Sequence, residues 1–588
     1  MRFYKKSMLA LALAAVFAMS SLGLTSPMAV QAVPFGQVAQ VPGAFWPLST
    51  AFQNAWDSRN SADIVRYGRQ VINFWLGDAD FEERAAHWGQ NVTDYGFIIN
   101  NIWFTANRTA DHYELLDNRE GALWALRVAY AFARPYQALI PHIGGNPADM
   151  EFAMTQLRNR IAALDASISL FAELLGDAGR TVYFGALHEP PTGLFFGEQP
   201  GSPTISDRPS QPSGLTIYVE FETENLRQRV LHDLDLNETM HNLYRGDYSI
   251  IQIAWNFLHE GATPPTVPAQ RAKIVEAAHF LNELGLPILL RVGGEVDVWT
   301  TPADPDEFIA AFRFIANIMR EIAPNVAMVY SVNSVSAHDR DWQMYYPGDD
   351  YVDWVGISLY TIRYFQGNPA TTDVDAAIYR TGRFAYPIGF IRELVEQFGD
   401  RKPLLISEGG VSLYNSYNSA DLTDWALPRM RQMYAYIPML FPEVKAIFWF
   451  NVYVPGGNQR YDFYKSPRAL ELYKALTAQE NFLARGQSYS PVTFREIGAE
   501  PVSMPANRVA LLTYAPFFTL DSIEVQYRLN GYWIGQATDI PYRRVFDFSD
   551  RPDGQHVLRI TVFDNGRVLQ EQDFSLTKYG DVVTITMG

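Results

Sequence analysis

Two glutamates in this sequence each stand where a short apolar run meets a pair of glycines. Glu295 follows the run Pro287–Val292, and Glu408 follows the run Leu404–Ser407. Runs of this length suit buried strands and are too short for helices. A carboxylate beside the end of a rigid strand is placed for chemistry more than for packing. Two such carboxylates predict a glycosidase, because a pair of Asp or Glu side chains flanks the bond that these enzymes hydrolyse.

The strands that carry these glutamates belong to a longer series in which strands and helices alternate. Eight strands joined by helical crossovers over roughly 300 residues predict a (β/α)8 TIM barrel of the α/β class. We expect this barrel to span residues 181–485. Its predicted strands are Thr181–Ala186, Leu215–Glu220, Ser249–Asn256, Pro287–Val292, Val326–Ser331, Trp354–Leu359, Leu404–Ser407 and Ala446–Phe450. Its predicted amphipathic helices are Ala269–Leu284, Pro305–Glu321, Ile388–Phe398 and Pro428–Leu440.

An all-α helical domain is predicted ahead of the barrel, over residues 36–178, where apolar residues recur with the helical period. Its third helix is predicted over Arg119–Ala133, ended by Pro135, because proline disrupts a helix interior. Its fourth helix is predicted from the capping pair Asn146-Pro147 to Gly176.

A β-sandwich of immunoglobulin-like type is predicted behind the barrel, over residues 490–588. Short alternating runs separated by turn signals replace the helical period there. The predicted strands are Arg508–Tyr514, Ser522–Leu529, His556–Phe563 and Val568–Leu576.

The first residues of the chain read as a secretory signal peptide, residues 1–32. Three cations precede the apolar run Met8–Met19, and Ala29–Ala32 ends in the small-residue pattern of a cleavage site. The run is short for a membrane span, so we expect cleavage and a secreted, extracellular protein. No later stretch of the sequence approaches the length of a membrane span.

Composition narrows the class of partner. The net charge of −17 disfavours nucleic acid, and a polysaccharide substrate agrees with it. The chain has no cysteine, which excludes disulfides, thiolate metal sites and a cysteine nucleophile. No metal-ligand spacing, phosphate loop or dinucleotide pattern appears, so the sequence implies no metal and no cofactor. The helical domain leaves a cell-surface or protein partner open.

The two glutamates must differ in protonation to act as a pair. In a (β/α)8 barrel the strand ends at the carboxyl side form the active site, and Glu295 and Glu408 follow the fourth and seventh predicted strands. Retaining glycosidases hold two carboxyl groups about 5–5.5 Å apart, one as acid/base and one as nucleophile. The acid must stay protonated near neutral pH while the nucleophile is ionised. Arg291, on the same strand as Glu295, is the candidate cation for keeping a carboxylate charged.

Residues 249–450 resemble glycoside hydrolase family 26. The resemblance is carried by four pieces: Arg291-x-x-x-Glu295, Tyr330-Ser-Val-Asn333, Ile406-Ser407-Glu408 and the stretch Tyr345–Tyr360 that leads through the sixth predicted strand. The resemblance implies Glu295 as acid/base, Glu408 as nucleophile and Tyr360 as a partner of the nucleophile. It also implies that Trp255 and Trp449 line the sugar site.

One position departs from the family pattern. Members usually have histidine immediately before the acid/base, where this chain has Gly294. Members cleave β-mannan most often, so the resemblance implies a mannan endo-1,4-β-mannosidase-like hydrolase, with mixed-linkage β-glucan or xylan as the alternative substrates.

Two further residues are predicted to contact the substrate, and two His-Glu pairs are alternative candidates for catalysis. Asn333, after the fifth predicted strand, and Trp299, shortly after Glu295, are candidate sugar contacts. The pairs His188-Glu189 and His259-Glu260 also follow predicted strands, but they lack the preceding arginine, and solvated loop residues are the expectation for both. The rival interpretation of the whole chain is a non-catalytic barrel that binds a polysaccharide or cell-wall polymer.

Overall fold

The computed structural model describes most of the chain from Phe45 to Gly588. The described segments are 45–76, 92–116, 118–143, 168–176, 181–199, 212–221, 224–235, 250–256, 268–296, 305–334, 342–361, 387–415, 419–452, 459–484, 489–515, 523–564 and 566–588, with scattered residues between 148 and 161 and at 487. The predicted signal peptide lies outside them, as do Trp299, His259 and Glu260.

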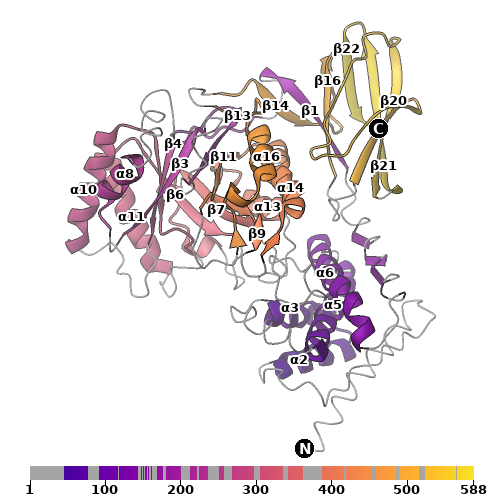
Figure 1. Ribbon diagram of the computed structural model, residues 1–588, viewed down its shortest axis with the longest axis horizontal. Helices are drawn as coiled ribbons and strands as arrows, with labels where there is room; N and C mark the ends of the chain where they lie inside the picture. The colour runs from indigo at the N-terminus through magenta and orange to yellow at the C-terminus, as the bar shows by residue number, and fades with distance from the viewer. Residues whose placement is uncertain are drawn as a thin grey trace, which may run out of the picture. The chain divides into compact units, whose positions relative to one another are not determined.

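Eight parallel strands close into a barrel, which confirms the predicted fold (Figure 1). Each strand pairs with its neighbour in chain order, and the last strand pairs with the first through Ala446 and Phe195. The eight strands are β2 (Leu194–Glu198), β3 (Gly214–Glu220), β4 (Ile250–Asn256), β5 (Ile288–Val292), β6 (Val326–Asn333), β7 (Trp354–Thr361), β8 (Leu404–Val411) and β11 (Val444–Trp449).

The first predicted barrel strand, Thr181–Ala186, is wrong. These residues form no strand, and β2 opens the barrel instead. The segment runs beneath the amino ends of the strands, where Trp354 Nε1 donates a hydrogen bond to Leu187 O over 2.8 Å. Pairing with β11 on one side and β3 on the other makes Leu194–Glu198 the barrel strand.

Helices cover the outside of the barrel, and those predicted at Ala269–Leu284, Pro305–Glu321 and Ile388–Phe398 are among them (Figure 1). The predicted helix at Pro428–Leu440 is the later part of a longer helical run from Thr423 to Leu440. The middle section of this run, Gln432–Tyr436, is a π-helix. The helices of this layer are α8 (Leu226–Asp235), α10 (Pro268–Leu284), α11 (Pro305–Ile322), α13 (Pro387–Phe398), α14 (Thr423–Arg431), α15 (Ile437–Leu440) and α16 (Pro467–Thr477).

The barrel interior is filled in layers, apolar at one end and polar towards the other. Ile250, Leu289, Trp354 and Phe448 are among the buried side chains of the apolar cluster. One layer further, Gln252 Nε2 donates to Thr216 Oγ1 and to Ser407 O, over 3.0 and 2.6 Å. Because side chains alternate between the two faces of a strand, these residues fix which positions point into the barrel.

Antiparallel strands behind the barrel form a four-stranded and a six-stranded sheet, called the sandwich below. Thr513 and Tyr527 join the two sheets, because their hydroxyl groups hydrogen-bond over 2.7 Å. The sheets are β14 (Val492–Glu496), β1 (Ser169–Leu175), β16 (Val509–Tyr514) and β19 (Arg544–Phe546), and β15 (Val502–Pro505), β22 (Val582–Met587), β21 (Arg567–Tyr579), β20 (Gly554–Asp564), β17 (Ile523–Leu529) and β18 (Tyr532–Ala537).

Strand β1 corrects the predicted end of the helical region. Residues 169–175 were predicted as the last turns of a helix closed at Gly176, but they pair with β14 and β16 inside the sandwich. Leu170, Ala172 and Leu174 are buried there. The run is apolar enough to suit either a buried helix or a buried strand, and its partners lie more than 300 residues further on.

The helical segments ahead of β1 belong to a different compact unit from the barrel and the sandwich. Two of these helices pack closely at Gly68, because a Cβ atom at this position would lie only 2.1 Å from Thr109 Oγ1. The predicted stop at Pro135 is wrong, because α6 continues to Ile143 and Tyr136 beyond the proline is buried. The described helices are α2 (Phe45–Asp57), α3 (Ser61–Leu76), α5 (Val92–Leu115) and α6 (Arg119–Ile143). None of the helices in the described segments is long and apolar enough to cross a membrane.

Candidate active site

Glu408 reaches the barrel mouth through a β-bulge in β8. Ile406 pairs with Ile357 and Glu408 with Ser358, so β8 has one extra residue at this point, and the pairing with β11 shifts at the same place. Ser407 points into the barrel, where its hydroxyl group lies 2.8 Å from that of Ser331. Strict alternation would then turn Glu408 outward, and the extra residue brings it inward as well.

Three hydrogen-bond donors converge on the Glu408 carboxylate. Arg291 Nη1 donates to Oε2 over 2.6 Å, and Tyr360 Oη donates to Oε1 over 2.5 Å. Tyr218, from β3, also hydrogen-bonds to Glu408. Arg291 is 1% exposed and its second nitrogen donates to Ser358 Oγ over 2.8 Å, so the guanidinium group is held in one place. These donors hold the Glu408 carboxylate in one orientation at the barrel mouth, as a nucleophile requires.

Glu295 stands on a short turn fastened to both neighbouring strands. Gly293 N donates to Trp255 O over 2.9 Å, and Val296 N donates to Ser331 O over 3.4 Å. Both glycines of the turn have positive φ, 80° and 58°, a conformation that glycine adopts without strain. The turn therefore places the carboxyl group at the mouth, where its side chain hydrogen-bonds to Asn333 and Ser358.

The environment of Glu295 favours its protonated form. Burial raises the pKa of the Glu295 carboxyl above its ordinary value, and the negative charge of Glu408 raises it further. Arg291 and the hydrogen bonds from Asn333 and Ser358 oppose this shift without cancelling it. A carboxyl group that keeps its proton can serve as general acid, and a neighbour ringed by donors can serve as nucleophile.

Three aromatic side chains near Glu408 were missed by sequence reasoning: Tyr218, Phe450 and Tyr461. They are half-buried and lie together with the predicted Tyr360, whose ring centroid is 4.8 Å from that of Tyr461. The ring of Phe450 lies 6.2 Å from that of Tyr218 and 6.0 Å from that of Tyr360. Phe450 follows Phe448 by two residues, so alternation predicts its inward direction once Phe448 is known to face the interior.

Two tryptophans predicted to line the sugar site face away from it. Trp449 is 1% exposed, and its ring stacks on Phe463 with centroids 5.2 Å apart, between β11 and α16. Trp255 is fully buried, with its ring 4.9 Å from that of Phe221, over which Lys273 of α10 lies. Both predictions are wrong because each residue is next in sequence to one that faces the interior, and a strand turns neighbours to opposite faces.

Among the competing pairs, His188-Glu189 has a structural role. Glu189 is 7% exposed, not solvated as predicted, and its carboxylate accepts the backbone N–H groups of Phe184 and Ala186. His188 Nε2 lies 2.8 Å from Asn325 O, just before β6 begins. The pair closes the amino end of the barrel, opposite the carboxylates.

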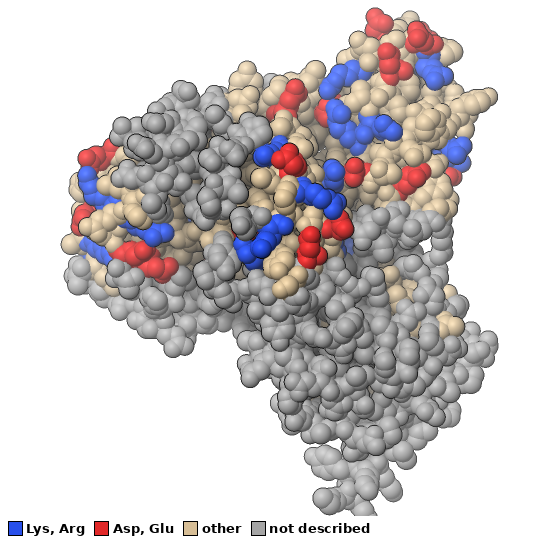
Figure 2. Space-filling view, in the orientation of Figure 1, with Lys and Arg blue, Asp and Glu red and all other residues tan. Residues whose placement is uncertain are grey.

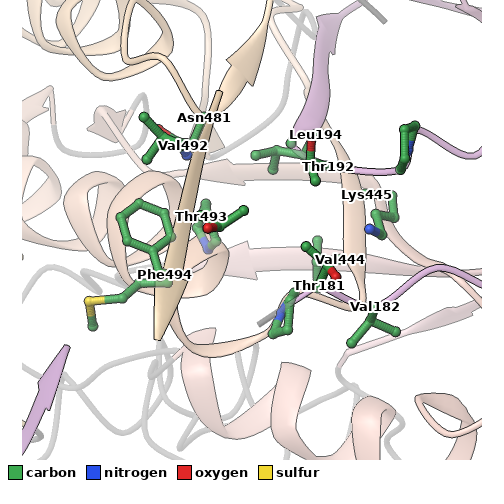
Figure 3. A pocket seen from close by; sticks show the side chains of 15 residues that line it. Thr181, Val182, Thr192, Leu194, Val444, Lys445, Asn481, Val492, Thr493 and Phe494 are labelled. Carbon is green, nitrogen blue, oxygen red and sulfur yellow. The ribbon is translucent and has the colours of Figure 1, made fainter. Parts of the chain in front are cut away.

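A small pocket at this same end is no candidate for a polymer site (Figure 3). Leu194 and Val444, at the first residues of their strands, line it together with Lys445, Asn481 and Thr493. Its volume of about 40 Å³ suits water more than a sugar. No cluster of three or more His, Cys, Asp or Glu side chains that would hold a metal ion occurs in the described segments.

Comparisons with known proteins agree with the motifs of the barrel. Residues 254–402 match the sequence model of glycosyl hydrolase family 26, which confirms the predicted resemblance. The matched segment contains Glu295 and Tyr360 and ends before Glu408. A β-1,3-xylanase from Alcaligenes sp. is 28% identical over 156 residues, 25% of this chain and 32% of that protein, so the chain spans about a third of the length of this curated relative.

Solved structures similar to this chain include two mannanases. A double mutant of the Cellulomonas fimi endo-β-1,4-mannanase is 14% identical, with a TM-score of 0.36 over 65% of this chain and 94% of that chain. A family 26 β-mannanase from Bacteroides ovatus is 16% identical, with a TM-score of 0.36 over 51% of this chain and 92% of that chain. At these TM-scores the fold assignment rests on the strand pairing within this chain.

Proposed function

We propose that this protein is a secreted endo-β-glycanase of glycoside hydrolase family 26 type that cleaves its polymer with retention of configuration. The observation that carries the proposal is the unequal environment of the two carboxyl groups. Burial and a neighbouring negative charge raise the pKa of Glu295, whereas Arg291, Tyr360 and Tyr218 all hydrogen-bond to Glu408. One barrel mouth thus offers a proton donor and a second carboxyl group positioned to attack.

In the first step, Glu408 attacks the anomeric carbon while the proton of Glu295 passes to the leaving oxygen. The bond between the two sugars breaks, and a covalent sugar ester forms on Glu408. In the second step, Glu295, now ionised, takes a proton from water, whose oxygen displaces Glu408 from the anomeric carbon. Two inversions give net retention, and both carboxyl groups return to their first state.

The half-buried rings around Glu408 suit a sugar ring at the cleavage point. Phe450, Tyr461 and Tyr360 supply apolar faces beside the nucleophile. A neutral polymer with β-linkages fits this lining. β-Mannan is the proposed substrate, and β-1,3-xylan is the second candidate because the matched relative is a β-1,3-xylanase.

The experiment is reducing-sugar release by the protein without residues 1–32 from β-mannan, β-1,3-xylan, β-1,4-xylan and mixed-linkage β-glucan, beside Glu408→Gln. We expect release from one polymer and a loss of at least about 10⁴-fold in the variant, because the nucleophile is removed. Equal rates for the two proteins would remove Glu408 from the mechanism. Polymer binding without any release would favour the non-catalytic barrel.

A further inference from the structure

The six-stranded sheet of the sandwich has a second side that faces away from the other sheet. Along β17, buried and half-buried side chains alternate. Tyr527 is one of the buried ones, and its hydroxyl group lies 2.7 Å from that of Thr513 in the four-stranded sheet. Because neighbours on a strand point to opposite sides, Arg528 faces away from that sheet, as does its partner Arg559 on β20. This side of the six-stranded sheet is called the outer face below.

Two exposed aromatic rings lie on the outer face. The turn Asn530-Gly531 has positive φ at both residues, as a two-residue hairpin favours, and it leads into the edge strand β18, where Trp533 pairs with Arg528. Trp533 is 57% exposed. Tyr579, the last residue of β21, is 82% exposed, and it also points outward because its neighbour Lys578 is buried. Single exposed apolar side chains are common, so the surface between the two rings decides what they could bind.

The charged side chains of the outer face neutralise one another. Arg559 donates to both carboxylate oxygens of Asp573 over 2.7 Å, and its Nη1 lies 2.9 Å from Glu571 Oε1. Arg528 and Glu524, at alternate positions of β17, add one charge of each sign. No surplus of positive charge is therefore left for a nucleic acid or an acidic polymer. Charged residues are also depleted from the cores of protein interfaces, so this network disfavours a protein partner.

We propose that the outer face binds a chain of the neutral polysaccharide that the barrel cuts, with the Trp533 ring stacked on the apolar side of one sugar unit. The amide of Gln526 and the hydroxyl group of Thr561, paired across β17 and β20, lie in the neighbouring row, and groups of both kinds hydrogen-bond to hydroxyl groups. Trp533 lies in the row that ends at Asp573, and Tyr579 is about 20 Å further along β21. Only a chain of several sugar units reaches both rings. This inference rests on the proposed function for the identity of the polymer.

The test measures binding of the full chain to insoluble particles of the four polymers named above, by depletion of protein from solution. Glu408→Gln serves as the parent, so that the polymer stays intact. Adding Trp533→Ala should weaken binding about threefold to tenfold, because one stacked ring is lost. Adding Trp533→Tyr instead keeps a ring and should retain most of the binding. Both variants should unfold at the temperature of the parent, because Trp533 is already exposed.

The matched control is Tyr489→Ala. Tyr489 is 64% exposed but precedes β14 of the four-stranded sheet, so its loss should leave polymer binding unchanged. A second readout uses the active enzyme with Glu408 intact. Trp533→Ala should cut a short soluble oligosaccharide with unchanged kcat and KM, because the barrel alone holds it. On insoluble polymer below saturation, the same variant should release sugar about threefold to tenfold more slowly, because the outer face no longer keeps polymer near the barrel.

The outcomes separate this inference from the proposed function. If Glu408→Gln is inactive while Trp533→Ala binds every polymer as tightly as its parent, the hydrolase proposal stands and the role of the outer face is overturned. If no polymer is cut but one is held less tightly after Trp533→Ala, the hydrolase proposal fails and the outer face is supported. An equal loss of activity on the short oligosaccharide would place the effect of Trp533 in the barrel and contradict the inference. A parent that binds none of these polymers contradicts it as well.

Discussion

At the scale of single residues, the proposed chemistry depends on what surrounds two glutamates. The sequence predicted Glu295, Glu408, Arg291, Asn333 and Tyr360 because each stands in a motif at a strand end. The structure brings these five together, with Asn333 beside Glu295. Tyr218 has no motif around it, and it enters the site only because β3 lies where its alternate residues face Glu408.

The charge of Glu408 helps keep the proton on Glu295, so the two groups are coupled. Glu408→Gln removes a negative charge that raises the Glu295 pKa and leaves the positive charge of Arg291 in place. We expect the pKa of Glu295 to be lower in this variant than in the wild type. Carbon NMR of the labelled carboxyl groups, titrated with pH, measures it, and an unchanged or higher pKa would contradict the coupling.

Glu295 should also make the stability of the fold depend on pH. Its pKa is raised in the folded protein, so folding loses stability as pH rises from the ordinary glutamate pKa of about 4.3 through the raised value. Glu295→Gln cannot ionise. Relative to the wild type, the variant should therefore be more stable above this window than below it. Urea unfolding of both proteins at the two pH values tests this, and a stability difference that does not change with pH would count against a buried, protonated Glu295.

At the scale of elements, the positions of most barrel strands were predictable from the sequence, but the irregularities within them were not. Strands β4 to β8 and β11 appear within a few residues of their predicted bounds, because each is a continuous apolar run. The bulge in β8 leaves no mark in the sequence, yet it decides that Glu408 points inward. Trp255 and Trp449 were wrongly predicted to line the sugar site for a similar reason. Which side of the sheet a side chain faces depends on the strand register, and only the pairing of strands sets that register.

Gln252 is the residue that fastens this bulge. Its amide group donates to Ser407 O, at the extra residue, and to Thr216 Oγ1. Gln252→Leu should lower the unfolding free energy by about 1–3 kcal/mol, because buried hydrogen-bonding groups lose their partner, and it should lower kcat by loosening Glu408. Thr216→Val is the matched control, because it removes only the second bond. Chemical denaturation and initial rates compare the two, and equal kcat values would show that Gln252 does not position Glu408.

At the scale of the whole molecule, the barrel is inserted between parts of the sandwich. Strand β1 precedes the barrel in the chain and lies between β14 and β16, which follow it. Tyr436 adds a direct link, because Ala515 N donates to its hydroxyl oxygen over 3.2 Å. Positive and negative side chains are interspersed over the described part of the face in Figure 2, which offers no broad patch of one sign. This order of elements could not be predicted from composition, since β1 resembles its helical surroundings.

Two truncated chains test this arrangement. Residues 167–588 keep β1, whereas residues 177–588 lose it and with it the buried Leu170, Phe171 and Leu174. Burying three such side chains contributes on the order of 5 kcal/mol, so the shorter chain should unfold at a much lower temperature or fail to fold. Calorimetry of both gives the answer, and equal stabilities would show that the sandwich does not need β1.

The measurement that bears most directly on the two-carboxylate mechanism is the anomeric configuration of the first product. Proton NMR in the first minutes of hydrolysis, before the sugar interconverts, distinguishes the two anomers. With Glu408 as nucleophile and Glu295 as acid/base, we expect the β-anomer to appear first and the α-anomer to follow only as the sugar equilibrates. Initial appearance of the α-anomer would mean direct attack by water, and it would contradict a covalent role for Glu408.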